Sequence, residues 1–326
     1  GHVCYLLSEY DEAVRHLKRS ADLFGAIGQG ESAIVHDALK FLAGSYEAAG
    51  RQSEALPLRQ RVAEMAVTLF GDISNLSAEA INDLAFAYYR RGDFDRAERE
   101  FDKALELNRT IHGDSHPLVA DVMGNIALTL QARGRYHDAI TMFEQVFAML
   151  DELPEDKQTD AFAVLKLNFG LVLLEIRRFS QAEAALLESI RIFEHLYGYG
   201  YGGAAISLLN LGMVYEGQGR YREADSVLKL SIEIGETALG PDNPGLAHAL
   251  NNLGNLYDRL GRYDEALPIQ ERAVRILEKA LGGQHPEVAK FRRDLGRLYA
   301  LAGASDESID SYHKCINWSQ RYLENV

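Results

Sequence analysis

The stretch Gly261-Arg262-Tyr263-Asp264-Glu265-Ala266 decides the fold of this chain, because related stretches recur along its length. The copies begin at positions 8, 50, 92, 134, 177, 219, 261 and 303, so successive copies are 42 residues apart, with one interval of 43. A fixed period in this range is typical of a stacked array of repeats and argues against a single closed globule. In such an array each repeat contacts only its neighbours, and function lies on a long continuous surface.

The repeat from 243 to 283 shows how one unit is predicted to fold. Asn243 is a favourable helix cap, and Pro244 suits the first helical position because its missing N–H has no intrahelical partner there. Gly261 is expected to end this helix, since glycine readily adopts the left-handed conformation of a C-terminal cap. Apolar residues recur at spacings of three and four on both sides of Gly261, at Ala249, Leu253, Leu256, Tyr257 and Leu260 and at Ala266, Ile269, Ala273, Ile276, Leu277 and Ala280. The spacing predicts two amphipathic helices of about 17 residues each and hence an all-α fold of stacked helical hairpins, a solenoid.

The period also predicts the organisation of the chain as one array. Seven full hairpins are expected from about Glu31 to Trp318, preceded by a single helix near Tyr10 to Phe24. The predicted boundaries are 1–28 for a truncated first repeat, followed by 29–71, 72–113, 114–152, 153–198, 199–240, 241–282 and 283–326. The sequence lacks an initiator Met and begins midway through a repeat, so we expect it to be a fragment of a longer protein.

Composition disfavours several classes of partner. A formal charge of −14 argues against nucleic acids and anionic membrane surfaces, both of which attract basic proteins.

No apolar run approaches the ~18 residues of a membrane span, and no signal peptide is evident. The two cysteines, Cys4 and Cys315, lie in the first and last repeats, too far apart in a solenoid for a disulfide. Free thiols suit a reducing compartment, so a cytoplasmic location is predicted.

Two short elements relate the repeats to a known family. The first helix carries Leu211-Gly212 with Tyr215, Leu253-Gly254 with Tyr257 and Leu295-Gly296 with Tyr299, and softer versions at Leu42-Ala43 with Tyr46 and Leu84-Ala85 with Tyr88. The second helix carries Ala97 with Phe101 and Ala139 with Phe143. In these elements the sequence resembles tetratricopeptide repeats. Its long period and its His116-Pro117 and His285-Pro286 pairs resemble the subtype found in kinesin light chains and many bacterial regulators. The resemblance implies a right-handed superhelix that binds a protein or peptide, without identifying the ligand.

In the family that the sequence resembles, the first helix of each hairpin lines a concave groove. One groove position, nine residues before the turn, is asparagine in four consecutive repeats, at Asn125, Asn168, Asn210 and Asn252. Asp83 and Asp294 flank this row. Because an amide both donates and accepts hydrogen bonds, the row is predicted to pair with the main chain of an extended peptide, as the resemblance also implies. The alternative is that these side chains stabilise neighbouring helices.

Further groove candidates lie beside this row. Leu167, Leu171, Leu209 and Met213, together with Val164 and Ile206, form a predicted apolar floor, and Asn251 and Asn255 are additional polar candidates. Lys290, Arg293 and Arg297 recur at spacings of three and four on one helical face. In an acidic protein such a basic cluster favours an acidic or carboxylate-bearing ligand segment. The alternative is that these cations are solvated and paired with acidic neighbours such as Asp294 and Glu287.

No constellation of residues predicts an enzyme, a metal site or a cofactor. His112 and His116 are placed around a turn, so zinc ligation is not expected. The segment from Gly198 to Gly203 has the spacing of a dinucleotide motif, but a helix is predicted before it where that motif requires a strand. Some related repeats bind the C-terminal carboxylate of chaperones through a lysine and an asparagine at set groove positions. Lys40 occupies the lysine position, but Gly44 stands where the asparagine is needed, and Phe41 interrupts the polar row, so this role is not expected.

The sequence therefore predicts a non-enzymatic scaffold that binds an extended peptide segment of a partner protein. One alternative is a sensor or regulatory arm that controls an effector outside this chain. Another is self-association through the terminal repeats.

Overall fold

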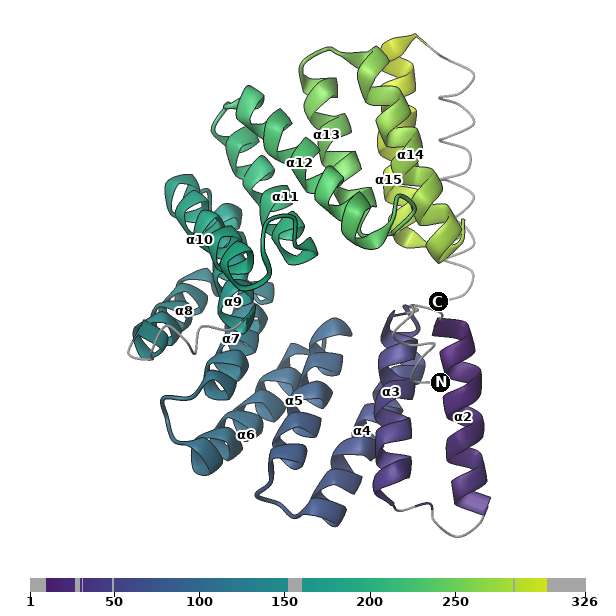
Figure 1. The fold of residues 1–326 in the computed structure, drawn as a ribbon, viewed down its shortest axis with the longest axis vertical. Coiled ribbons are helices and arrows are strands. Elements are labelled where there is room, and N and C mark those ends of the chain that lie inside the picture. The colour runs from purple at the N-terminus through teal and green to yellow at the C-terminus, as the bar shows by residue number, and fades with distance from the viewer. Residues whose placement is uncertain are drawn as a thin grey trace. The chain divides into compact units, whose positions relative to one another are not determined.

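The computed structural model describes residues 10–26, 30, 32–48, 50–151, 160–283 and 285–303, which are helical apart from short connections (Figure 1). The chain divides into two compact units, residues 1–157 and 158–326, here called unit 1 and unit 2. Within the described ranges no strand occurs, and the prediction of an all-α solenoid fold is confirmed.

Each unit is a stack of helical hairpins. Unit 1 contains α2 (Tyr10–Ala26), α3 (Ala33–Ala48), α4 (Gln52–Phe70), α5 (Asn75–Arg90), α6 (Phe94–His112), α7 (Pro117–Ala132) and α8 (Tyr136–Asp151). Unit 2 contains α9 (Asp160–Glu175), α10 (Phe179–Tyr197), α11 (Gly202–Gly217), α12 (Tyr221–Leu239), α13 (Leu246–Arg259), α14 (Tyr263–Leu281) and α15 (Pro286–Ala302). The helix predicted after α15, Cys4 and Cys315 lie outside the described residues.

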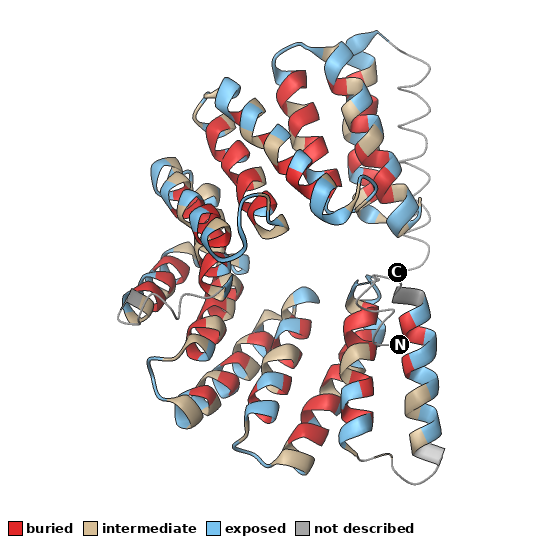
Figure 2. Cartoon of the chain, viewed as in Figure 1, coloured by how far each residue is buried: buried red, intermediate tan, exposed pale blue. Residues whose placement is uncertain are grey.

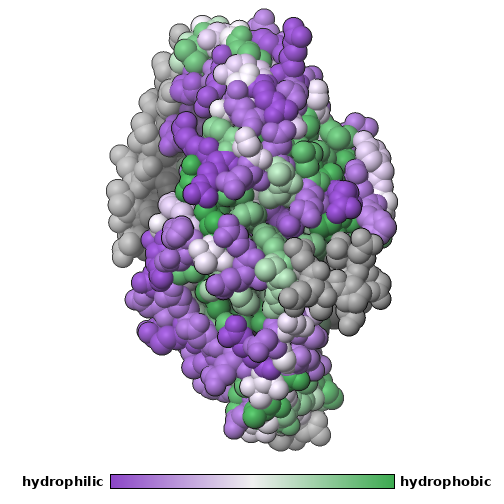
Figure 3. All heavy atoms as spheres, turned by 90° about the vertical axis from the view of Figure 1, so that its left-hand side faces the viewer, coloured by the Kyte–Doolittle hydropathy of each residue, from purple (hydrophilic) through white to green (hydrophobic). Residues whose placement is uncertain are grey.

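The hairpin cores form where the two helices of a repeat approach closely. A Cβ atom on Gly212 would lie 2.6 Å from the Cγ atom of Leu228, so a larger residue at this position would force Leu228 or its helix to shift. Leu228 is fully buried at that contact. Buried residues (red in Figure 2) accordingly follow the helix faces that meet inside the hairpins, as the apolar spacing predicts. On the face shown in Figure 3, hydrophilic side chains (purple) are interspersed with hydrophobic ones (green).

The helix ends follow the predicted turn chemistry with one exception. Gly261 has a φ of 69° after α13, as expected for a C-terminal cap. However, α13 begins at Leu246, not at Pro244. The Asn243 side chain accepts a hydrogen bond from the Gly245 N–H at 2.9 Å, and its carbonyl accepts one from the Leu246 N–H at 3.0 Å. Asn243 therefore closes a separate turn before the helix.

Arg177 is the one non-glycine residue with a positive φ, 58°, in the described part of the chain. It occupies the turn position that is glycine in most other repeats, for example Gly219 and Gly261. In the left-handed region a Cβ atom crowds the following carbonyl oxygen, which costs roughly 1–2 kcal/mol. The turn between α9 and α10 is therefore strained.

Replacing Arg177 with glycine is expected to stabilise unit 2 by about 1 kcal/mol, because the strain is relieved and only part of the gain is lost to the greater flexibility of glycine. Urea denaturation followed by circular dichroism measures the change. The matched control is Arg178→Gly, where φ is −81° and no strain exists, so this substitution is expected to destabilise the protein slightly. Equal effects of the two substitutions would contradict the strain.

Candidate functional site

The first helices of consecutive hairpins lie side by side within each unit. In unit 1 the Lys40 ammonium on α3 lies 2.6 Å from the Glu79 carboxylate on α5. In unit 2 the Arg259 guanidinium on α13 lies 2.8 Å from the Glu216 carboxylate on α11. Direct helix contacts also join α5 to α7, α9 to α11 and α11 to α13. The first helices thus make one continuous face in each unit, here called the first-helix face.

Unit 2 has a broad pocket of about 1060 Å³ on this face. Helices α9, α11, α13 and α15 contribute to it, together with the first residues of α10 and α12. The lining residues are Leu174, Glu175, Arg177, Phe179, Met213, Glu216, Gly217, Gln218, Gly219, Tyr221, Asn252, Asn255, Asp258, Arg259, Asp294 and Arg297. The pocket brings together five of the predicted groove residues, namely Met213, Asn252, Asn255, Asp294 and Arg297.

Most charges in this unit 2 pocket are paired. Arg259 pairs with Glu216, and Arg297 pairs with Asp258. Burial raises the pKa of the Glu216 carboxyl, although the charge of Arg259 opposes this. Arg177 forms no ion pair with any described residue. The pocket wall is therefore held by ion pairs, and the exposed Arg177 side chain stands at its edge.

The four asparagines of the predicted row have different hydrogen-bonding states. The Asn125 amide donates to Asn82 at 3.2 Å, and the Asn210 amide donates to the carbonyl of Ile206, in its own helix, at 2.8 Å. The Asn168 and Asn252 side chains are half-buried and form no hydrogen bond with any described residue. Among the four, only these last two amides have both their donor and their acceptor group without a described partner.

The predicted apolar floor is partly exposed. The exposed fraction is 53% for Ile206, 42% for Val164 and 39% for Met213. Leu171 and Leu209 are half-buried, whereas Leu167 is buried in the core. The exposed apolar surface of α9 and α11 is thus formed mainly by Val164, Ile206 and Met213.

The basic cluster on α15 is only partly paired. Arg293 lies 3.2 Å from its neighbour Asp294, and Arg297 pairs with Asp258. Glu287 pairs with His248 at 2.9 Å and not with this cluster. Lys290 is exposed and forms no ion pair with any described residue. The cluster therefore presents Lys290 as its least compensated positive charge.

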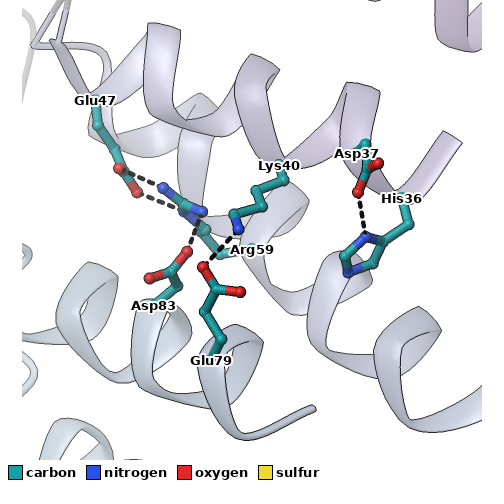
Figure 4. Close-up of polar contacts among 7 residues, drawn as sticks. All are labelled: His36, Asp37, Lys40, Glu47, Arg59, Glu79 and Asp83. Atoms are coloured by element: carbon teal, nitrogen blue, oxygen red, sulfur yellow. Dashed lines mark hydrogen bonds and ion pairs between the residues drawn. The ribbon is translucent and has the colours of Figure 1, made fainter. Parts of the chain in front are cut away.

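In unit 1 an ionic network around the buried Arg59 reaches the first-helix face (Figure 4). Arg59 on α4 donates to both carboxylate oxygens of Glu47 at 2.9 Å and to Asp83 at 2.7 Å. Burial raises the pKa of Asp83 even with Arg59 beside it. Asp83, a predicted groove residue, is therefore engaged in holding α5 to α4.

Sequence reasoning missed Arg59, although the repeats carried a signal for it. The same position in the next two hairpins is held by Phe101 and Phe143, which are fully buried. A charged residue in a core position of the period requires buried partners. Aligning the repeats with one another identifies Arg59 as a charged residue at a core position, whereas its partners follow only from the structure.

The histidines and glycines considered as motifs in the sequence lie at helix ends and in turns. No group of three or more His, Cys, Asp or Glu side chains there could hold a metal ion. His112 ends α6 and His116 precedes α7, and their rings stack with centroids 4.1 Å apart. The helix α10, not a strand, precedes the glycines from Gly198 onward. Among the helices that the structure describes, none is long and apolar enough to cross a membrane.

Comparison with known proteins supports the fold. The family model for the tetratricopeptide repeat matches residues 76–152, 161–237, 218–279 and 246–317. A comparison with curated protein sequences finds no match.

Several solved structures are similar over most of the chain. BtubC (BKLC) from P. vanneervenii is 24% identical, with a TM-score of 0.56, covering 73% of this chain and 92% of that protein. The apo form of the quorum sensor NprR from B. thuringiensis is 16% identical, with a TM-score of 0.69, covering 97% of this chain and 86% of that protein. The apo form of RapI is 15% identical, with a TM-score of 0.61, covering 89% of this chain and 99% of that protein. At these identities the likeness concerns the fold alone.

Proposed function

Because the chain belongs to the tetratricopeptide repeat family, whose fold typically serves as a non-enzymatic interaction scaffold, we propose that it binds an extended peptide segment of a partner protein. The proposed binding surface is the first-helix face of unit 2. The observation that carries this proposal is the pair of half-buried amides, Asn168 and Asn252, that lack partners among the described residues.

The spacing of these amides suits an extended chain. Asn168 lies on α9 and Asn252 on α13, and α11 contacts both helices. Packed helix axes are about 8–10 Å apart, so two steps span roughly 16–20 Å. An extended peptide covers about 3.3 Å per residue, so five or six residues would join the two amides. Such amides pair with main-chain groups and are largely indifferent to the peptide sequence.

The side chains around the amides suggest the class of segment. Val164, Ile206 and Met213 offer exposed apolar surface on α9 and α11. Lys290 and Arg293 are exposed on α15. A segment with an apolar side chain over the first group and an acidic residue over the second would complement both.

The test begins with peptides selected from a random library on the full chain. The double substitution Asn168→Ala and Asn252→Ala is expected to weaken the selected peptides about tenfold or more, because two ligand hydrogen bonds are lost. Isothermal titration calorimetry measures the affinity, and circular dichroism checks that the helices remain.

The matched control uses the two asparagines of the same row whose amides are already engaged. The double substitution Asn125→Ala and Asn210→Ala removes amides whose amino groups already donate within the protein, and Asn125 lies in unit 1, so affinity is expected to fall much less than in the Asn168 and Asn252 variant. If the two double variants weakened binding equally, or if neither did, the amide pair would not be the binding element.

A further inference from the structure

Gln270 on α14 occupies a position that is apolar in most of the other hairpins. The equivalent residues are Phe101, Phe143, Leu186 and Leu228, all fully buried. Gln270 is equally buried, with 1% of its surface exposed. An amide has therefore replaced a core side chain in this repeat.

The hydrogen bonding of Gln270 is incomplete. Its Nε2 atom donates to the Oδ1 atom of Asn255 at 2.7 Å. Its Oε1 atom is buried and has no hydrogen-bond partner among the described residues. A buried polar atom without a partner destabilises a fold, and leucine at this position would avoid that loss. The glutamine is thus not explained by stability.

The backbone beside Gln270 makes its contact with Asn255 possible. A Cβ atom on Gly254 would lie 2.4 Å from the Gln270 Cγ atom, so the glutamine passes through space that only glycine leaves open. It then reaches Asn255, the next residue of α13, which lines the unit 2 pocket. Gln270 therefore connects the interior of the hairpin to the pocket wall.

This contact determines which polar group of the Asn255 amide remains for a ligand. With Oδ1 accepting from Gln270, the Nδ2 amino group remains and donates to no described residue. We propose that Gln270 is a positioning residue that holds Asn255 as a hydrogen-bond donor to a carbonyl or carboxylate oxygen of a bound peptide. The proposal rests on the function proposed above and adds Asn255 and Gln270 to its binding elements.

A second hairpin uses the same position in a comparable way. Arg59 on α4 is the equivalent of Gln270, and it reaches Asp83 on the first-helix face of unit 1. A polar residue at this position can therefore extend from the second helix to the first-helix face. The two cases differ in chemistry, because Arg59 has its hydrogen-bond partners in Glu47 and Asp83 whereas the Gln270 carbonyl oxygen has none.

The test replaces Gln270 with leucine and measures stability and peptide binding in the full chain, using the peptides selected on the wild type. Gln270→Leu is expected to raise the melting temperature by about 2 °C or more, since an unpaired buried oxygen is removed. The same substitution is expected to weaken the peptides about fivefold, because the Asn255 amide is free to turn. Asn255→Ala is expected to weaken them to a similar extent. The double variant Gln270→Leu with Asn255→Ala should bind the peptides no more weakly than either single variant, because the two residues act through one contact.

The matched control is Leu228→Met, a volume-conserving change at the same position of the preceding hairpin, which is expected to leave affinity unchanged. The positioning role alone would be overturned if Gln270→Leu bound the peptides as tightly as the wild type. In that outcome Asn255→Ala and the double Asn168 and Asn252 variant would still bind them weakly. A melting temperature several degrees lower would also overturn it, because Gln270 would then be a stabilising core residue. If peptide affinity did not change in any of these variants, the proposed binding surface on unit 2 and this inference would be overturned together.

Discussion

Replacing Arg59 with alanine is expected to destabilise unit 1 by about 3–5 kcal/mol, the largest loss we foresee from a polar residue. The substitution leaves the half-buried Glu47 and Asp83 carboxylates without the guanidinium that neutralises both. Burial already raises the pKa of Asp83 in the wild type, so protonation neutralises this carboxylate readily as the pH falls. The loss is therefore expected to be smaller at about pH 4 than at about pH 7. Urea denaturation at both pH values measures it.

A compensated variant separates the charge effect from packing. Arg59→Phe with Glu47→Gln and Asp83→Asn places in this hairpin the residue type found at Phe101 and removes both half-buried negative charges. Such replacements of buried ionic groups by apolar ones are often neutral or stabilising, so most of the stability is expected to return. If Arg59→Ala cost less than about 1 kcal/mol, the network would behave like an exposed ion pair, contrary to our expectation.

Replacing Phe101 with alanine is expected to destabilise unit 1 by about 3–5 kcal/mol, because a fully buried aromatic ring is removed from the centre of a hairpin. Phe101 is the equivalent of Arg59 in the next repeat. The Phe101 and Arg59 variants therefore compare an apolar and an ionic residue at the same repeat position. Thermal and urea denaturation of the full chain measure the loss.

The matched control is Phe101→Leu, since Leu186 and Leu228 hold this position in unit 2. This smaller change is expected to cost about 1 kcal/mol. Equal losses for the alanine and leucine variants would show that the hairpin collapses around the missing ring, so that packing at this position is not specific.

The repeat architecture could be predicted from the sequence because its signals are local. The turn glycine, the helix caps and the apolar spacing all act within about one turn of helix. His116 and His285 precede proline in the sequence, and each accepts a hydrogen bond from the backbone N–H two residues later, at 3.2 Å. The predicted start of α13 at Pro244 was wrong because Asn243 closes a turn of its own. The N-cap of α13 is Gly245, only two residues after Asn243, and nothing in the local sequence shows which of the two begins the helix.

The candidate site was less accessible to sequence reasoning. Asn125, Asn168, Asn210 and Asn252 are identical in type and register, yet two are engaged and two lack partners among the described residues. The difference arises from the surrounding residues, such as Asn82 on the neighbouring helix, which the register alone does not reveal. The same holds for Asn251, which is buried although it adjoins the half-buried Asn252.

The helix face on which a ligand is expected follows from the resemblance to tetratricopeptide repeats, whereas the sequence by itself determined the all-α solenoid fold and the order of its hairpins. These features depend on interactions between residues near one another in the chain, which recur with every period. Only the tertiary structure decided which polar side chains on that face are already engaged, and that Gln270 and Arg59 reach through a hairpin to its other side. Hydrogen bonds and ion pairs of this kind act over a few ångströms between residues 15 to 43 positions apart, and packing alone brings them together.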